Sequence, residues 1–173
     1  MSLDYTIDTR EMRMKDKQVT DRDEILEIIN NCERCRLGFS DDGVPYVIPI
    51  NFGFTYEDGA LTLFFHCAAE GRKMDIIKKN PVVCFEMDCD YRLNPKENVD
   101  KNAIKYESVI GTGIIKIVED HQEKRMILGN MIKKFRRYNP LYRPNPLTDD
   151  RVRGVVIMKL KAHEFKAKRL YHI

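Results

Sequence analysis

Two Asp-Gly turns between apolar segments constrain the fold of this chain more than any other feature. The turn 41–43 (Asp-Asp-Gly) separates a short run at 36–40 from one at 44–56, and the turn 57–59 (Glu-Asp-Gly) leads into a run at 60–66. Asp and Gly accept the positive φ that a tight hairpin needs, so each turn predicts two neighbouring antiparallel strands. Strands joined in this way argue against a parallel sheet built from alternating strands and helices.

Three more segments rich in β-branched residues predict strands at 82–87, 106–118 and 154–166. Gly111 and Gly113 predict a bulge or a close backbone approach in the second of them. The polar stretch 88–104 predicts a long loop, and 136–150, with three prolines, predicts a connector.

Helices are predicted over 21–32, over 70–79 and from 120 to 135, the first and last with capping-box-like starts and apolar positions at helical spacing. Six strands and three helices in this order predict a mainly β fold, a six-stranded antiparallel β-barrel with peripheral α-helices. We expect one domain over residues 1–173, with residues 1–16 as an extended N-terminal arm.

Composition and net charge argue against two classes of binding partner, nucleic acids and membranes. The 173 residues are 43% hydrophobic, and 30 Lys and Arg against 27 Asp and Glu leave a formal charge of only +3, so no nucleic-acid partner is expected. The basic run 133–137 is predicted to be a solvated helix face. No apolar run is long enough for a membrane span and no secretory signal is visible, so we expect a cytoplasmic protein without a membrane partner.

The five cysteines are an odd number, which favours reduced thiols over a disulfide framework. Cys32 and Cys35 form a C-x-x-C pair, but no second pair stands at zinc-ligand spacing. We therefore expect structural thiols and no metal site.

The segment 64–81 is the most informative about function. It reads as a buried strand, a small-residue turn, the pair Arg72-Lys73 at a helix start, and an Asn-Pro stop. A helix N-terminus presents unpaired N–H groups and a partial positive charge, so two cations there predict a phosphate site, although a solvated helix start is the alternative. His66 stands just before the turn, where it could reach whatever the phosphate is attached to. A histidine bonded to backbone at the strand end is the alternative.

Three motifs in order carry a family resemblance: 45–53 (Pro-Tyr-Val-Ile-Pro-Ile-Asn-Phe-Gly), 65–73 (Phe-His-Cys-Ala-Ala-Glu-Gly-Arg-Lys) and 106–113 (Tyr-Glu-Ser-Val-Ile-Gly-Thr-Gly). With the closing strand, they resemble the FMN-binding split-barrel superfamily, the fold of pyridoxamine 5′-phosphate oxidase. Within it the chain most resembles the 5-nitroimidazole-resistance reductase branch. The absence of Trp, and with it of the oxidases' C-terminal Trp-containing segment, argues against vitamin B6 oxidation.

The resemblance implies a homodimer with FMN at the interface, its phosphate bound by Arg72 and Lys73. The other cofactor-binding positions that it implies lie in the strand beneath the flavin, at the end of the strand before the turn and in the fifth strand: Val47, Ile48, Pro49, Ile50, Asn51, Phe65, His66 and Ser108. For Asn51 an ordinary polar strand end is an equal alternative. His66 is the candidate catalytic residue, placed to protonate or orient a substrate.

The function implied is that of an FMN-dependent reductase, which passes electrons from NAD(P)H or another donor to a small acceptor such as a nitroimidazole. Two alternatives remain open on the same fold. One is a non-catalytic flavin-binding or flavin-sensing protein, and the other is a protein that binds another ligand, such as haem.

Overall fold

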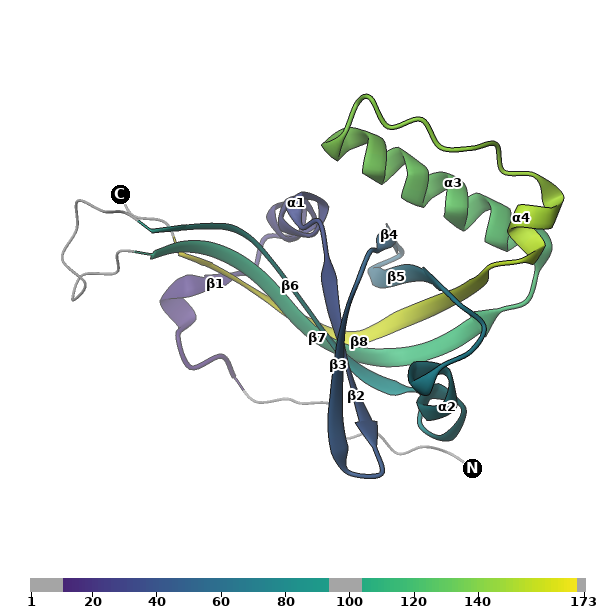
Figure 1. Cartoon of the computed structure of the whole chain (residues 1–173). Coiled ribbons are helices and arrows are strands. Elements are labelled where there is room, and N and C mark those ends of the chain that lie inside the picture. The colour runs from purple at the N-terminus through teal and green to yellow at the C-terminus, as the bar shows by residue number, and fades with distance from the viewer. Residues whose placement is uncertain (1–10, 94–103, 171–173) are drawn as a thin grey trace.

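The computed structural model describes residues 11–93 and 104–170, and its centre is one antiparallel sheet of eight strands (Figure 1). The strands follow in the order β3-β2-β6-β7-β8-β5-β4, and β1 pairs with β8. Their bounds are Gln18–Val19 (β1), Cys35–Asp41 (β2), Val44–Ile50 (β3), Gly53–Glu57 (β4), Ala60–Cys67 (β5), Val82–Leu93 (β6), Ile104–Val118 (β7) and Val156–Leu170 (β8). The predicted antiparallel, mainly β fold with peripheral helices is confirmed, with eight strands in place of six.

The extra strands have local causes. The predicted strand 44–56 breaks at Asn51 and Phe52, so it becomes β3 and β4, which lie at opposite ends of the strand order. The two-residue β1 lies between the predicted N-terminal arm 1–16 and the predicted helix 21–32, and a short 3₁₀ turn, Lys15–Lys17, precedes it. Residues 1–10 of the arm lie outside the described residues.

The loop predicted over 88–104 is wrong for its first part, because β6 continues to Leu93. Ion pairs compensate the charges that suggested a loop. Arg36 pairs with Asp88 and with Glu86 (2.8 Å), and Lys105 of the next strand pairs with Asp90. The rest of the predicted loop, 94–103, lies outside the described residues.

Four helices surround the sheet: α1 (Arg22–Asn31), α2 (Arg72–Lys79), α3 (His121–Tyr138) and α4 (Asp149–Arg153). The predicted caps of two are present, since the Asp21 side chain accepts from the N–H of Glu24 (3.0 Å) and Asp120 from that of Glu123 (2.7 Å). The short α4 falls within and just beyond the segment predicted as a connector. None of the helices in the described parts of the chain has the length and apolar character needed to cross a membrane.

The helices cover different parts of the sheet (Figure 1). Helix α3 lies over β4, α1 packs against β6 and β7, and α2 contacts β2 near the hairpin that β2 forms with β3. The main core fills the inside of the curved sheet with fully buried side chains, among them Leu37, Phe52, Leu63, Phe65 and Phe85. A smaller core under α3 contains Phe64, Val118, Ile127, Met131 and Ile157.

The two glycines of β7 mark close approaches, as predicted. A Cβ on Gly111 would stand 2.4 Å from the carbonyl oxygen of Glu164, and one on Gly113 would stand 2.4 Å from that of Lys161. The register of β7 and β8 also shifts between Thr112 and Gly113. The absence of a side chain at these two positions therefore allows the backbones of β7 and β8 to approach each other closely next to the register shift.

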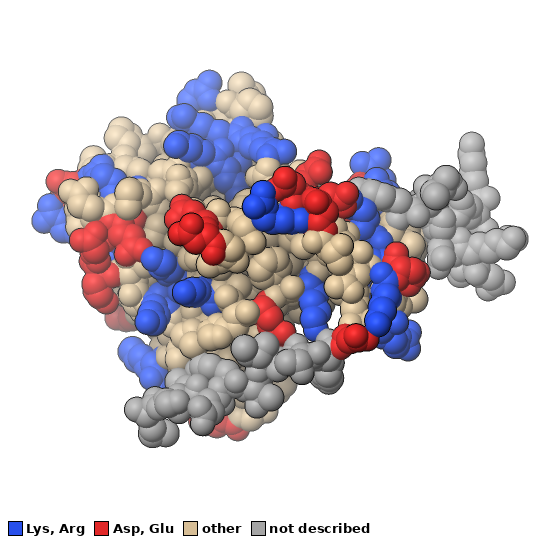
Figure 2. Space-filling model, turned by 180° about the vertical axis from the view of Figure 1, so that it is seen from behind, with Lys and Arg blue, Asp and Glu red and all other residues tan. Residues whose placement is uncertain are grey.

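Charged side chains of both signs are interspersed over the face shown in Figure 2, apart from a basic group at the top, on the side where Figure 1 places α3. The basic run 133–137 is only partly the solvated face that was predicted. Lys133, Arg136 and Arg137 are exposed, but Lys134 is 8% exposed. Its spacing on the helix turns it inward.

Lys134 ties α3 to the end of α1. Its Nζ donates to the carbonyl oxygen of Ile29 (3.1 Å) and lies 3.8 Å from the centre of the Phe52 ring. Desolvation lowers the pKa of this amine to about 8. On the next turn the Tyr138 hydroxyl donates to the carbonyl oxygen of Cys32 (2.9 Å).

Candidate functional site

The start of α2 has the features of an anion site. Gly71 is the N-cap residue, with φ of 116° and no capping side chain, and this backbone conformation is why α2 begins at Arg72 and not at residue 70 as predicted. The first intrahelical bonds run to the Gly71 carbonyl oxygen from the N–H groups of Met74 (2.8 Å) and Asp75 (3.4 Å). The N–H groups of Arg72 and Lys73 precede these bonds, at the positive end of the helix dipole.

The two cations at this helix start differ in their surroundings. Arg72 donates through Nε to Asp41 Oδ2 (2.9 Å), and its guanidinium lies 4.5 Å from the centre of the Tyr46 ring. The Nε bond uses one of five N–H groups, so the other four remain for a ligand. Lys73 has no hydrogen bond or ion pair to any other described residue. Its ammonium is near Cys67, whose pKa is raised by desolvation against the opposing effect of that charge.

His66 is the next candidate residue along the chain, near the end of β5. Its exposed ring borders a hollow of about 400 Å³ that also contains Asn51, which the turn from β3 to β4 brings to the same place. This outer hollow is completed by residues of the α1–β2 link, α3 and the following segment: Glu33, Arg34, Phe135, Tyr138 and Tyr142. Desolvation lowers the pKa of His66, so the imidazole is neutral at neutral pH and can both donate and accept a hydrogen bond.

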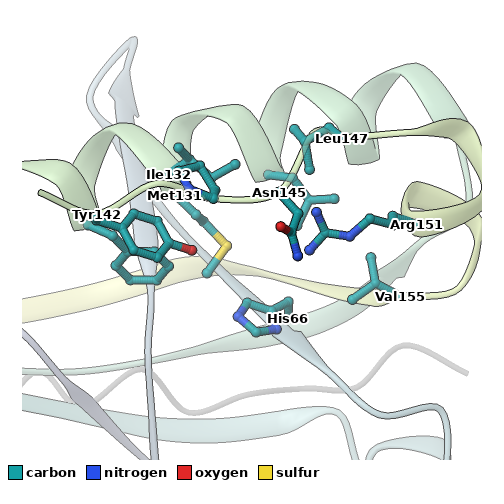
Figure 3. A pocket seen from close by; sticks show the side chains of 11 residues that line it. His66, Met131, Ile132, Tyr142, Asn145, Leu147, Arg151 and Val155 are labelled. Carbon is teal, nitrogen blue, oxygen red and sulfur yellow. The ribbon is translucent and has the colours of Figure 1, made fainter.

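A second hollow, of about 190 Å³, also borders His66 and is called the inner hollow below (Figure 3). Apolar side chains of α3 form one wall, with Leu128, Met131 and Ile132 among them. The segment after α3 forms the opposite wall and contributes three side chains with polar groups, Tyr142, Asn145 and Arg151. In Figure 3 the ends of the Asn145 and Arg151 side chains point toward one another above His66.

The remaining predicted cofactor positions are distributed over the sheet. In β3, Val47 and Pro49 are exposed on the outer face, while Ile48 and Ile50 pack against the core. The Phe65 side chain is wholly buried, so only its backbone is available to a ligand.

Ser108 borders neither hollow next to His66. It lies on the outer face of β7, in a separate hollow that also contains Ile110 and Thr112. The structure thus brings Asn51 and His66 together and leaves Ser108 elsewhere.

Sequence reasoning missed the residues that surround His66 from the α3 side. Arg151 directly follows a segment predicted only as a connector, and Tyr142 and Asn145 come from that segment. Its three prolines, with an aromatic and an amide residue between them, are the signal that could have marked a binding loop.

The cysteines are free thiols. Cys32 and Cys35 are fully buried, and desolvation raises the pKa of Cys35 to about 12. The pKa of Cys32 is also raised, first by a hydrogen bond with Cys89 and then by desolvation. Neither thiol is a reactive thiolate at neutral pH. No group of three or more His, Cys, Asp or Glu residues in the described ranges has the arrangement of a metal site.

Solved structures with the same fold include proteins of several kinds. One, from Bacteroides thetaiotaomicron, has a suggested role in 5-nitroimidazole antibiotic resistance; it is 27% identical with a TM-score of 0.72 over 88% of this chain and 86% of that one. A flavocytochrome from Azotobacter vinelandii is 18% identical with a TM-score of 0.72, over 95% and 74%. An FAD and heme binding protein from Mycobacterium smegmatis is 16% identical with a TM-score of 0.71, over 90% and 74%.

Comparison with curated proteins found no match. The family model described as pyridoxamine 5′-phosphate oxidase, in contrast, matches residues 21–169, which is most of the chain and includes α2, His66 and both hollows. The antiparallel split-barrel fold and this match agree, and the chain belongs to the pyridoxamine 5′-phosphate oxidase family.

Proposed function

We propose that the chain is an FMN-binding reductase of the 5-nitroimidazole-resistance type. It would take electrons from NAD(P)H or another donor and pass them to a small acceptor such as a nitroimidazole. The observation that carries the proposal is the start of α2, where an uncapped glycine is followed at once by Arg72 and Lys73. The similarity to the Bacteroides protein supports the choice of acceptor.

The residues at this helix start fit the phosphate of FMN. A phosphate needs several N–H donors and positive charge, and Lys73, the free N–H groups of Arg72 and the first backbone N–H groups of α2 supply both. Asp41 and Tyr46 hold the guanidinium of Arg72 in place, which lowers the entropy that binding costs. FMN, and not riboflavin, is the ligand that uses these groups.

His66 is the residue we assign to the acceptor side. A bound flavin supplies the redox chemistry. The imidazole of His66 lies beside the hollow that Asn51 shares. Its ring N–H would hydrogen-bond an acceptor that gains electrons, and its protonated form, a stronger acid because the pKa is lowered, would give that acceptor a proton. Asn51 and the exposed positions of β3 would orient the ring system.

The second candidate is a flavin- or haem-binding protein without catalysis. Its support is that the flavocytochrome and the FAD and heme binding protein share this fold, together with the exposure of the His66 ring, because histidine is a common haem ligand.

We also propose that the chain works as a cytoplasmic homodimer. Two apolar side chains stand out on the outer face of the sheet, Val47 (61% exposed) and Ile110 (51% exposed). A second copy would cover them. The five free thiols support a reducing compartment.

The absorption spectrum of the purified protein, followed by titration with FMN, FAD and haem, tests the choice of cofactor. The proposal expects flavin bands and tightest binding of FMN, whereas a Soret band with no flavin affinity contradicts it. Stopped-flow reduction by NAD(P)H and reoxidation by a nitroimidazole then separate a reductase from a binding protein.

A further inference from the structure

We propose that the inner hollow is a binding site for a small aromatic carboxylate, a single-ring acid of about the size of benzoate. The proposal concerns the hollow above His66 alone, goes beyond the reductase function and requires no flavin.

The size and lining of the inner hollow define the body of the ligand. An apolar cavity of ~150 Å³ is known to take up benzene, and the inner hollow has about 190 Å³. Its α3 wall is formed by Leu128, Met131, Ile132 and Phe135, and Leu147 and Val155 extend the apolar lining. The space therefore fits one ring with one small substituent, and it excludes a flavin or a haem.

Arg151 defines the charge of the ligand. Its guanidinium donates through one terminal nitrogen to the carbonyl oxygen of Pro146 (2.9 Å) and forms no ion pair with any described residue. Its neighbours Arg125 and Arg153, in contrast, both pair with Asp149. Arg151 is an exposed residue at the border of an apolar hollow, its four remaining N–H groups are available to an anion, and the planar fork matches a carboxylate.

Two neutral donors complete the polar end of the hollow. The amide of Asn145 points toward Arg151 above His66, and the neutral imidazole of His66 adds one more N–H (Figure 3). None of the described side chains that line the hollow is acidic. The polar end is thus built of donors and one positive charge, which a carboxylate satisfies and a cation does not.

The wall that carries Arg151 and Asn145 is held in place. Arg125 donates to the carbonyl oxygen of Leu147 (2.6 Å) and pairs with Asp149, which also contacts His121 (3.2 Å). The Thr148 hydroxyl caps α4 by accepting from the N–H of Arg151 (3.4 Å). A wall fixed by these contacts loses little entropy when a ligand binds.

Isothermal titration calorimetry on the purified full chain near neutral pH tests the site, with benzoate as the probe. Benzyl alcohol supplies the ring without the charge, and acetate supplies the charge without the ring. We expect saturable binding of benzoate and at least roughly tenfold weaker binding of the other two.

Arg151→Gln should weaken benzoate roughly ten- to hundredfold and leave benzyl alcohol unchanged, because a charge-assisted contact is lost. Arg151→Lys should lie between, since it keeps the charge without the fork. Arg153→Gln on the same helix is the matched control and should bind benzoate as wild type does. Thermal melting checks that all three variants fold.

The proposal is overturned by failure of benzoate to saturate the wild type, by equal affinity of Arg151→Gln and wild type, or by equal loss in Arg153→Gln. Because the titration is done with and without added FMN, failure here leaves the flavin proposal intact. Loss of flavin binding alone leaves the benzoate result intact.

Discussion

At the scale of single residues, the two neighbouring cations at the start of α2 differ in their contacts. Arg72 is attached to the β2–β3 hairpin through Asp41 and Tyr46, whereas Lys73 has no partner in the described residues. In the proposed FMN site, Arg72 would therefore serve both the fold and the phosphate, and Lys73 would serve the phosphate alone.

The double change Arg72→Ala and Lys73→Ala is expected to weaken FMN far more than riboflavin, because riboflavin lacks the phosphate. Each contact should contribute on the order of 1.5–3 kcal/mol. Titration of both ligands, followed by flavin fluorescence, measures the difference.

The single variants separate the two roles. Lys73→Ala should lose FMN affinity with no change in melting temperature, and Arg72→Ala should lose some of both. Lys78→Ala, in the last turn of the same helix, is the control. An equal loss for FMN and riboflavin would mean that the pair supports only the fold.

His66→Ala should keep the fold and most of the FMN affinity but slow flavin reoxidation by a nitroimidazole. The imidazole borders the hollows and not the phosphate site, so the change removes a proton donor beside the acceptor. Stopped-flow measurement of reduction and reoxidation separates the two steps. The pH dependence of reoxidation should flatten in the variant. If both rates stay unchanged while the melting temperature falls, His66 has a structural role.

Lys134 makes stability depend on pH in a defined direction. Folding lowers its pKa from 10.5 to about 8, so between these values the unfolded chain binds more protons than the folded one. The free energy of unfolding that this residue contributes therefore rises with pH across that interval, by up to about 3 kcal/mol in total, and levels off above it.

Urea unfolding of wild type and Lys134→Met at several pH values checks this. The difference in free energy of unfolding, wild type minus variant, should increase from pH 8 to about 10.5. Cys35 and Tyr138, whose pKa values are raised to about 12, oppose the trend but are present in both proteins. A constant difference would show that folding does not shift the pKa of Lys134.

At the scale of helices and strands, tight turns and caps were predictable because their signals are local. Asp21 and Asp120 cap the helices whose starts they predicted. The predicted strand ended before residue 88 because Asp88 and Asp90 are charged. The ion pairs that compensate these charges are formed with Arg36 and Lys105, which belong to other strands. A prediction made from neighbouring residues alone cannot include partners that lie far away in the sequence.

The same reasoning explains which part of the site was predictable. Arg72, Lys73 and His66 stand within one continuous motif, so their pattern is visible in the sequence. Asn145 and Arg151 border the same hollow as His66 only because the folded chain places the segment after α3 near the end of β5. The inward turn of Lys134 likewise depends on packing against α1, which a run of basic residues does not reveal.

The glycines of β7 and α3 should respond in opposite ways to alanine. Gly113→Ala places a Cβ 2.4 Å from a backbone oxygen and should lower the free energy of unfolding by roughly 1–3 kcal/mol. Gly129→Ala, where the Cβ meets nothing within 4 Å, should raise it by roughly 0.5–1 kcal/mol, since glycine weakens a helix interior. Chemical denaturation measures both. A decrease in the free energy of unfolding for Gly129→Ala would contradict the conclusion that the space beside Gly129 is open.

At the scale of the whole molecule, the outer sheet face is where we expect the second copy. The register aligns Val47 with Gly38, Cys84 and Thr112, and Ile110 lies two residues from Thr112 on the same face. Two exposed apolar side chains on one face, which a second copy would cover, are the reason that we expect the dimer contact here.

Light scattering should therefore find a dimer for wild type and a monomer, or a much weaker dimer, for Ile110→Glu. Met126→Glu is the control, because Met126 is equally apolar and 65% exposed but lies on α3. A monomeric wild type with full flavin occupancy would contradict the homodimer.

The strand order ends at β3 on one side, so among the described residues β3 has a neighbour on only one edge. That edge strand contains Pro45 and Pro49, which have no N–H to donate to an added strand. Because these two N–H donors are missing, another strand pairs poorly with this edge. Natural sheets use prolines in this way to avoid edge-to-edge association. The proposed association through the outer sheet face would close after two copies, whereas association through an edge would continue into fibres, so the two prolines oppose open-ended assembly.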